Sequence, residues 1–179
     1  MELSIGQKVA YPTQGVCVVE DIKKRDDSCS DSTNYYFLRV LSDNSIIFVP
    51  TENAETVGIR PVISQRQFRK LMEFLGADFT DVSCDWKIRS REFGIKLQSG
   101  DVFEAADVLK KLTFLSHEKK LSFREQTYLE KARFLIVSEV INADLASEKT
   151  FEKKLDDLIE KACNKHLVTQ PRILAATNH

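Results

Sequence analysis

The segment of the sequence with the clearest chemical potential is DWKIRSREF, residues 85–93, which places the chain's only tryptophan, Trp86, among basic residues. Residues 86–96 carry four positive charges and one negative charge. An exposed indole ring in such a setting can insert against a base step in the minor groove of DNA while the cations contact phosphates. A buried tryptophan that packs the core, beside an ordinary solvated basic face, explains the same residues. Spacing alone does not decide between these interpretations.

No enzyme motif accompanies this segment. The sequence contains no nucleophile elbow, phosphate-binding loop, dinucleotide glycine pattern or metalloprotease motif. The four cysteines include no CxxC pair, and the three histidines show no ligand spacing. We therefore expect no catalytic residue, metal site, cofactor or small-molecule ligand, and we expect Cys17, Cys29, Cys84 and Cys163 to be free thiols in a reducing compartment.

Composition and charge narrow the class of protein further. The 179 residues are 42% hydrophobic and 30% charged, which is typical of a globular chain with one ordinary domain or two small ones. The net charge of −1 excludes a protein that holds nucleic acid by overall charge; residues 1–62 carry −3, residues 63–141 carry +2, and the remainder is neutral. Because the sequence has neither a long apolar run nor a signal-peptide pattern, we expect a cytoplasmic location without membrane contact.

The first part of the chain has the pattern of short strands separated by turns. We expect strands over residues 7–10, 16–22, 35–41 and 45–49, because these runs are rich in β-branched and aromatic residues. Pro50 should end the last of these strands, and Gly58 to Pro61 should lead out of the domain. The pattern predicts a small antiparallel β-barrel over residues 1–62.

From Ser64 onward the hydrophobic period becomes helical. Capping-box patterns predict helices after Ser64 and Ser122, and Asp101 begins a third helical pattern. We expect a further helix over residues 85–97, although Gly94 weakens it, and a last helix over about residues 148–162. The predicted architecture is therefore α+β: the β-barrel, then an all-helical bundle over residues 63–163, then a flexible tail over residues 164–179 that Pro171 separates from the last helix.

Three blocks in this order resemble the CarD family of bacterial transcription regulators. They are IGQKVAYPTQGVCVVEDI at 5–22, VPTENAETVGIRPVIS at 49–64, and a set that begins at Asp85-Trp86 and continues through KLQSGDVFEAADVLKKL at 96–112 and LSFREQTYLEKARFLIVSE at 121–139. The resemblance covers roughly residues 3–160. It implies a Tudor-like barrel that binds the beta subunit of RNA polymerase and a helical domain that contacts promoter DNA at the upstream edge of the melted region, with no enzymatic activity.

The resemblance also assigns residues to the two interfaces. It implies that Trp86 enters the minor groove at the junction of double-stranded and single-stranded DNA, with the neighbouring Lys87, Arg89 and Arg91 among the basic DNA contacts. Gln126 stands where some relatives carry a basic DNA-contacting residue, and Phe48 stands where some carry an arginine that contacts polymerase. Arg25 matches an arginine that pairs with acidic groups on polymerase. The strand that includes Ile46, Ile47 and Phe48 is the expected docking strand.

Two alternatives stay open at the level of the sequence. Phe48 can fill a pocket on a partner that adds a strand to the edge of the sheet, or it can lie buried in the barrel. The helical domain can contact promoter DNA, or it can recruit a protein partner, which would make the chain a polymerase-bound adaptor. The nearly neutral net charge and Gln126 favour the second reading, whereas the ordered blocks and Trp86 favour a factor that stabilises the open promoter complex.

Overall fold

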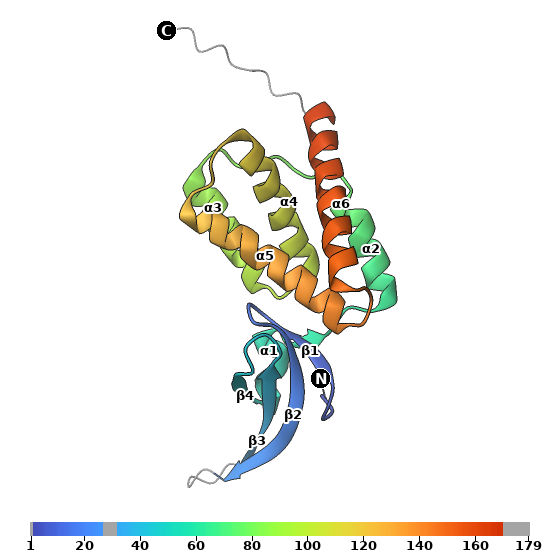
Figure 1. The fold of residues 1–179 in the computed structure, drawn as a ribbon. Helices are drawn as coiled ribbons and strands as arrows, with labels where there is room; N and C mark the ends of the chain where they lie inside the picture. The colour runs from blue at the N-terminus through green and yellow to red at the C-terminus, as the bar shows by residue number, and fades with distance from the viewer. Residues whose placement is uncertain (1, 27–31, 170–179) are drawn as a thin grey trace.

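The computed structural model describes residues 2–26 and 32–169 and divides them into a β module and a group of helices (Figure 1). The β module contains β1 (Lys8–Tyr11), β2 (Gly15–Asp26), β3 (Ser32–Val40), β4 (Ile46–Pro50) and β5 (Arg60–Pro61), with a 3-10 turn (Thr51–Asn53) and α1 (Ala54–Val57) before β5. The helices are α2 (Gln65–Leu75), α3 (Trp86–Gln98), α4 (Val102–Glu118), α5 (Phe123–Asn142) and α6 (Glu148–Thr169). The predicted α+β class is confirmed.

The β module is one five-stranded antiparallel sheet in the order β4-β3-β2-β1-β5. Its core is formed by alternating residues of the strands, among them Val9, Val19 and Leu38. The pairing of β2 with β3 shifts register between Val19 and Asp21, and such a bulge bends a strand. β4 pairs only with β3, so its other side is an edge of the sheet.

The helices begin where their capping residues predict. Ser64 and Ser122 each form a complete capping box, with Gln67 and Glu125 respectively, and Asp85 and Asp101 each accept a hydrogen bond from the first turn of the following helix. Satisfied N–H groups at a helix start stabilise that end by about 1 kcal/mol each. A separate apolar core joins the helices, and α4 supplies more of its buried residues than any other helix.

Helix α6 is longer than predicted. It continues to Thr169, so residues 164–169 are helical rather than part of a flexible tail. The reason lies in contacts distant in sequence: the buried His166 ring stacks on Phe79 at 4.1 Å between ring centroids, and His166 Nδ1 lies 2.8 Å from Asp78 Oδ1. Residues 170–179 lie outside the described part of the chain.

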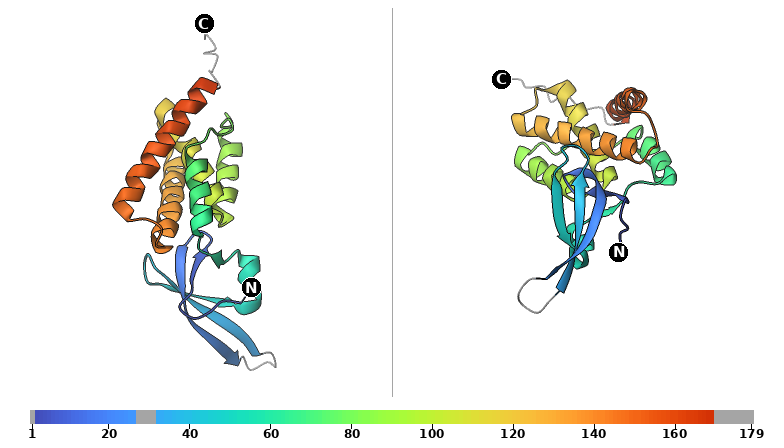
Figure 2. Two further views of the ribbon diagram at one scale, coloured as in Figure 1. Left: turned by 90° about the vertical axis from the view of Figure 1, so that its right-hand side faces the viewer. Right: turned by 60° about the horizontal axis from the view of Figure 1, so that its bottom comes forward.

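The C-terminal half of α5 packs on the β module, as both views of Figure 2 show. The contact involves the turn between β1 and β2. Gly15 in that turn has a φ of 87°, and a Cβ added there would lie 3.1 Å from the Phe134 ring of α5. A side chain at residue 15 would therefore suffer both backbone strain and crowding. Lys8 Nζ adds a second link, because it donates to the carbonyl oxygen of Asn142 at 2.7 Å.

Candidate functional site

Trp86 is the first residue of α3 and lies on the surface. Asp85 caps the helix through Oδ1, which accepts from the backbone N–H of Lys87 at 2.7 Å. The indole is 63% exposed, and Lys87 Nζ lies 5.8 Å from its ring centroid. The core interpretation of Trp86 is therefore wrong. An indole held at a helix start, uncovered by the protein, is available to a partner.

Arg89 differs from the expectation, because its side chain is buried. Only 3% of the residue is exposed, Nη2 and Nε donate to Glu125 Oε1 at 2.6 and 3.1 Å, and Nη1 donates to the carbonyl oxygen of Ser83 at 2.6 Å. With its donors directed into the protein, Arg89 cannot contact a phosphate in this conformation. The expectation that Arg89 contacts a phosphate is therefore wrong. Arg89 instead has a structural role, in which it joins the first turns of α3 and α5.

Glu125 is the residue that makes this role possible. Its second carboxylate oxygen accepts from the backbone N–H and the hydroxyl of Ser122 at 2.9 and 2.8 Å. Burial alone would raise the pKa of Glu125, but the hydrogen bonds from Ser122 and Arg89 outweigh it and lower that pKa to about 2. The capping box signals Glu125 in the sequence, but the pairing with Arg89, 36 residues away, leaves no local signal.

The exposed basic residues of α3 border a groove between α3 and α5. Lys87 and Arg91 line it together with Trp86, and Arg124 and Tyr128 line it from α5. Gln126 is exposed on α5 but does not line this groove. The structure thus brings Trp86, Lys87 and Arg91 together and leaves out Arg89 and Gln126. Arg124 is the lining cation that was not expected from the sequence.

The edge strand β4 presents a second apolar surface. Phe48 is 57% exposed and meets Phe37 of β3 edge to face at 4.7 Å between ring centroids, and Ile46 is 41% exposed. Phe37 pairs with Phe48 in the register of the two strands. The alternative of a buried Phe48 is therefore wrong. Ile47 points to the other side, where it packs against the core of the sheet, so it can offer a partner only its backbone.

The remaining predicted docking residue is Arg25. It lies near the end of β2, paired with Thr33 in the register, and its side chain is outside what the structure describes. Lys23, two residues earlier in β2, places Nζ 5.0 Å from the Phe37 ring centroid. A positive charge therefore borders the apolar surface of Phe37 and Phe48.

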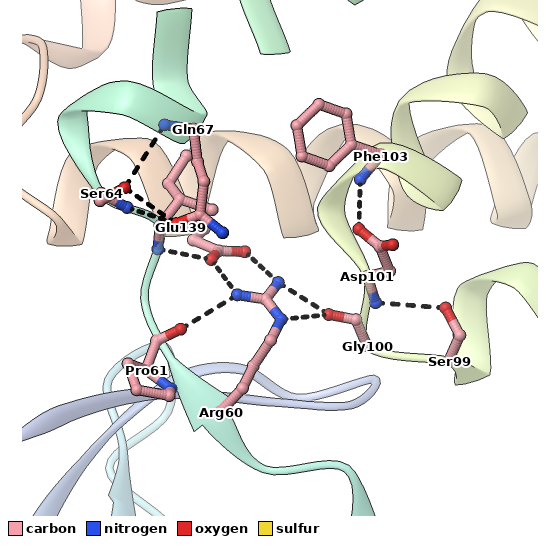
Figure 3. A network of polar contacts seen from close by, with 10 residues as sticks. Arg60, Pro61, Ser64, Gln67, Ser99, Gly100, Asp101, Phe103 and Glu139 are labelled. Carbon is pink, nitrogen blue, oxygen red and sulfur yellow. Dashed lines mark hydrogen bonds and ion pairs between the residues drawn. The ribbon is translucent and has the colours of Figure 1, made fainter. Parts of the chain in front are cut away.

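A polar network at the start of the helical domain joins the β module to the helices (Figure 3). Arg60 of β5 donates from Nη1 and Nη2 to the two oxygens of Glu139 on α5, at 2.5 and 2.9 Å, and from Nε and Nη2 to the carbonyl oxygen of Gly100 at 3.0 and 2.7 Å. Glu139 Oε1 also accepts from the N–H of Ile63 at 2.9 Å. Helix α5 thus carries a buried glutamate at each end: Glu125 pairs with Arg89 of α3, and Glu139 pairs with the partly exposed Arg60 of the sheet.

Other classes of site find little support in the described residues. In residues 2–26 and 32–169, no three histidine, cysteine or acidic side chains are grouped to hold a metal ion, and no helix is both long and apolar enough to span a membrane. Cys17, Cys84 and Cys163 are free thiols, and Cys29 lies outside the described residues.

Both parts of the chain match models of known protein domains. The CarD-like/TRCF RID domain matches residues 3–63, and the CarD C-terminal domain matches residues 70–156. The curated "Putative transcription factor YdeB" of Bacillus subtilis (strain 168) is 26% identical over 136 residues, which are 76% of this chain and 88% of YdeB. The solution NMR structure of the 72-residue N-terminal domain of Myxococcus xanthus CarD is 30% identical and covers 35% of this chain and 83% of that domain, with a TM-score of 0.29.

The two family matches lie side by side and together span nearly all of the described chain. The first is an RNA polymerase interaction domain, and proteins of this family are transcription regulators rather than enzymes. The chain therefore belongs to the CarD-like family of transcription factors that bind RNA polymerase.

Proposed function

We propose that this chain docks on the beta subunit of RNA polymerase through the edge of its β module and stabilises the open promoter complex with Trp86. In this proposal Trp86 enters the minor groove at the upstream edge of the melted region, while Lys87 and Arg91 contact neighbouring phosphates. The observation that carries it is the exposure of Trp86: 63% of the chain's only tryptophan is open to solvent, on a capped helix and beside cations.

The geometry of β4 supports the docking step. An exposed edge strand can pair with a strand of a partner, so that main-chain hydrogen bonds supply affinity and side-chain pockets supply specificity. Ile46 and Phe48 would fill such pockets, Ile47 would contribute its backbone, and Arg25 would pair with acidic groups of polymerase. The five-residue strand β4 exposes two large apolar side chains, Ile46 and Phe48, and a partner that covers them accounts for this composition.

The charge of the chain supports the division between docking and DNA contact. Lys87 and Arg91 alone would give only a weak, salt-sensitive affinity for free DNA, since each neutralised phosphate of a duplex contributes about 0.9 to the salt exponent. Tethering to polymerase raises the effective concentration at the promoter to about the millimolar range, which makes a weak contact occupied. The contact stabilises the open state only because it favours the open junction over the closed duplex.

The direct test replaces Trp86 by Ala and follows the lifetime of open complexes formed by the intact polymerase. We expect the lifetime to shorten about tenfold, which corresponds to ~1.4 kcal/mol of lost preference for the open state. Ile88→Ala is the matched control, because Ile88 is an exposed apolar residue of α3 outside the groove. Equal lifetimes for wild type and Trp86→Ala would contradict the proposal.

A footprint of the same complexes separates DNA contact from recruitment of a protein. We expect protection of the DNA just upstream of the melted region, and loss of that protection in Trp86→Ala. Firm polymerase binding without any such protection would instead favour the adaptor, whose helical domain binds a protein.

A further inference from the structure

The groove between α3 and α5 has one cation that the proposed DNA contact leaves unused. Arg124, the second residue of α5, lines the groove together with Trp86 and Arg91. Its Nη1 lies 3.5 Å from the hydroxyl of Ser90, which is at the limit of a hydrogen bond and leaves most donors of the guanidinium open. Arg124 is also exposed.

The charge of this groove is entirely positive among the described residues that line it. Its charged members are Lys87, Arg91 and Arg124, and no carboxylate is among them. Glu125, the acidic neighbour of Arg124, turns away from the groove because its carboxylate is buried with Arg89 and Ser122. Cations on both walls and the absence of a carboxylate make the groove complementary to a polyanion.

A glycine of α3, Gly94, lines the groove opposite Tyr128. Gly94 is the only residue of α3 without a side chain, and a Cβ built on it would lie 3.2 Å from the Tyr128 hydroxyl oxygen. A glycine inside a helix costs about 1 kcal/mol relative to alanine. Here it allows Tyr128 of α5 to approach the backbone of α3, which brings the two basic walls close together.

We infer that this groove holds the sugar-phosphate backbone of one DNA strand next to the step that Trp86 enters, and that Arg124 is its phosphate contact on α5. The inference rests on the proposed function and deepens it. Arg124 then supplies the positive charge that Gln126, on the same helix, lacks, and it takes the place of the buried Arg89. Arginine suits this role because its planar guanidinium can bind two phosphate oxygens at once.

The test compares Arg124→Gln, Arg124→Lys and a matched control in the open-complex lifetime assay, with the full chain and intact polymerase. Arg69→Gln is the control, since Arg69 is an exposed arginine of α2, away from the groove. We expect Arg124→Gln to shorten the lifetime about threefold to tenfold, the range for the net contribution of one ordinary hydrogen bond. Arg124→Lys should restore part of it, and Arg69→Gln should leave it unchanged.

Salt dependence supplies the readout that a purely structural role would not move. In Arg124→Gln the plot of log lifetime against log salt concentration should become shallower by up to about 0.9, the contribution of one phosphate. An unchanged lifetime and slope in Arg124→Gln, with a clear loss in Trp86→Ala, would overturn the role of Arg124 and leave the proposed function standing. If Trp86→Ala also has no effect, both fail. Weakened binding of Arg124→Gln to polymerase without DNA would show that the groove takes a protein segment, which also overturns the inference.

Discussion

Helix α5 carries a buried glutamate near each end, and the two glutamates pair with arginines from different domains. Glu125 pairs with Arg89 inside the helical domain, and both residues are almost completely covered. Glu139 pairs with Arg60, which belongs to the β module and keeps part of its side chain in solvent. Fourteen residues of α-helix separate the two glutamates, or about 21 Å along the axis. One pair holds the helix that carries Trp86, and the other holds the module that carries Phe48.

This difference indicates how one small protein keeps two surfaces in a fixed relation. The inner pair maintains the local shape around Trp86, so its loss should affect folding. The outer pair spans the two domains, so its loss should affect their relative orientation more than the fold of either. The following variants separate these effects.

The largest effect is expected for Arg89→Met. The change leaves the buried Glu125 carboxylate with only Lys119, whose half-exposed side chain places Nζ 3.7 Å from Oε1, and removing the buried partner of such a pair typically costs about 3 to 5 kcal/mol. We expect urea unfolding, followed by circular dichroism, to show a loss in this range. The double variant Arg89→Met with Glu125→Met should recover much of it, because replacing both charges removes the uncompensated one. A loss below about 1 kcal/mol for Arg89→Met would contradict the role of this pair.

Acid should weaken the inner pair in a defined window. Because the pKa of Glu125 is lowered to about 2 in the folded chain, against an ordinary value of 4.5, the folded state favours the carboxylate. Glu125 therefore contributes stability that is fully present above about pH 5 and is lost as pH falls toward 2. The stability difference between wild type and Glu125→Gln should shrink steadily from pH 5 to pH 3. A constant difference over this window would show that protonation of Glu125 is not involved.

A smaller loss, about 1 to 3 kcal/mol, is expected for Glu139→Gln, because the amide keeps the shape but loses the charge that holds Arg60. The decisive readout is hydrogen exchange at Ile63, whose N–H donates to Glu139. We expect faster exchange there, while the buried amides of α4 keep their protection. Uniformly faster exchange throughout both domains would mean that the pair supports global folding instead.

The smallest effect is expected for Arg133→Gln, which breaks an ion pair on the exposed side of the same helix. Arg133 donates to Asp156 at 2.5 Å; the Asp156 side chain is 57% exposed and the Arg133 side chain is 35% exposed, so neither charge is buried. Exposed pairs contribute about 0.2 to 1 kcal/mol, so unfolding should shift little. If Arg133→Gln lowered the free energy of unfolding as much as Glu139→Gln does, burial would not explain the difference between these two ion pairs.

Local patterns in the sequence are sufficient to predict where most of the helices and strands lie. The capping boxes at Ser64 and Ser122 mark the starts of α2 and α5, and Pro50 ends β4 as its missing N–H requires. Partners distant in sequence account for the errors. The burial of Arg89 depends on Glu125, and the extension of α6 depends on the stacking of His166 on Phe79, neither of which has a periodic signal.

The candidate site can be predicted only in part, because some of its contacts join residues that are distant in sequence. The resemblance to the CarD family selected Trp86, and its exposure agrees with that choice. Whether the other predicted residues belong to the site depends on the side of the helix on which each side chain lies. Arg91 lines the groove and Arg89 does not, although they are two residues apart and have the same chemistry. Arg124 could be recognised only once α3 and α5 were seen together.

The separation of docking from DNA contact is tested most directly by measuring open-complex lifetime against protein concentration for Phe48→Ala and Trp86→Ala. A docking defect is overcome by mass action, whereas a defect in the bound state persists at saturation. We predict that Phe48→Ala reaches the wild-type lifetime at higher concentration and that Trp86→Ala levels off at a shorter lifetime. The same curve for both variants, with a shared plateau at the wild-type value, would contradict it.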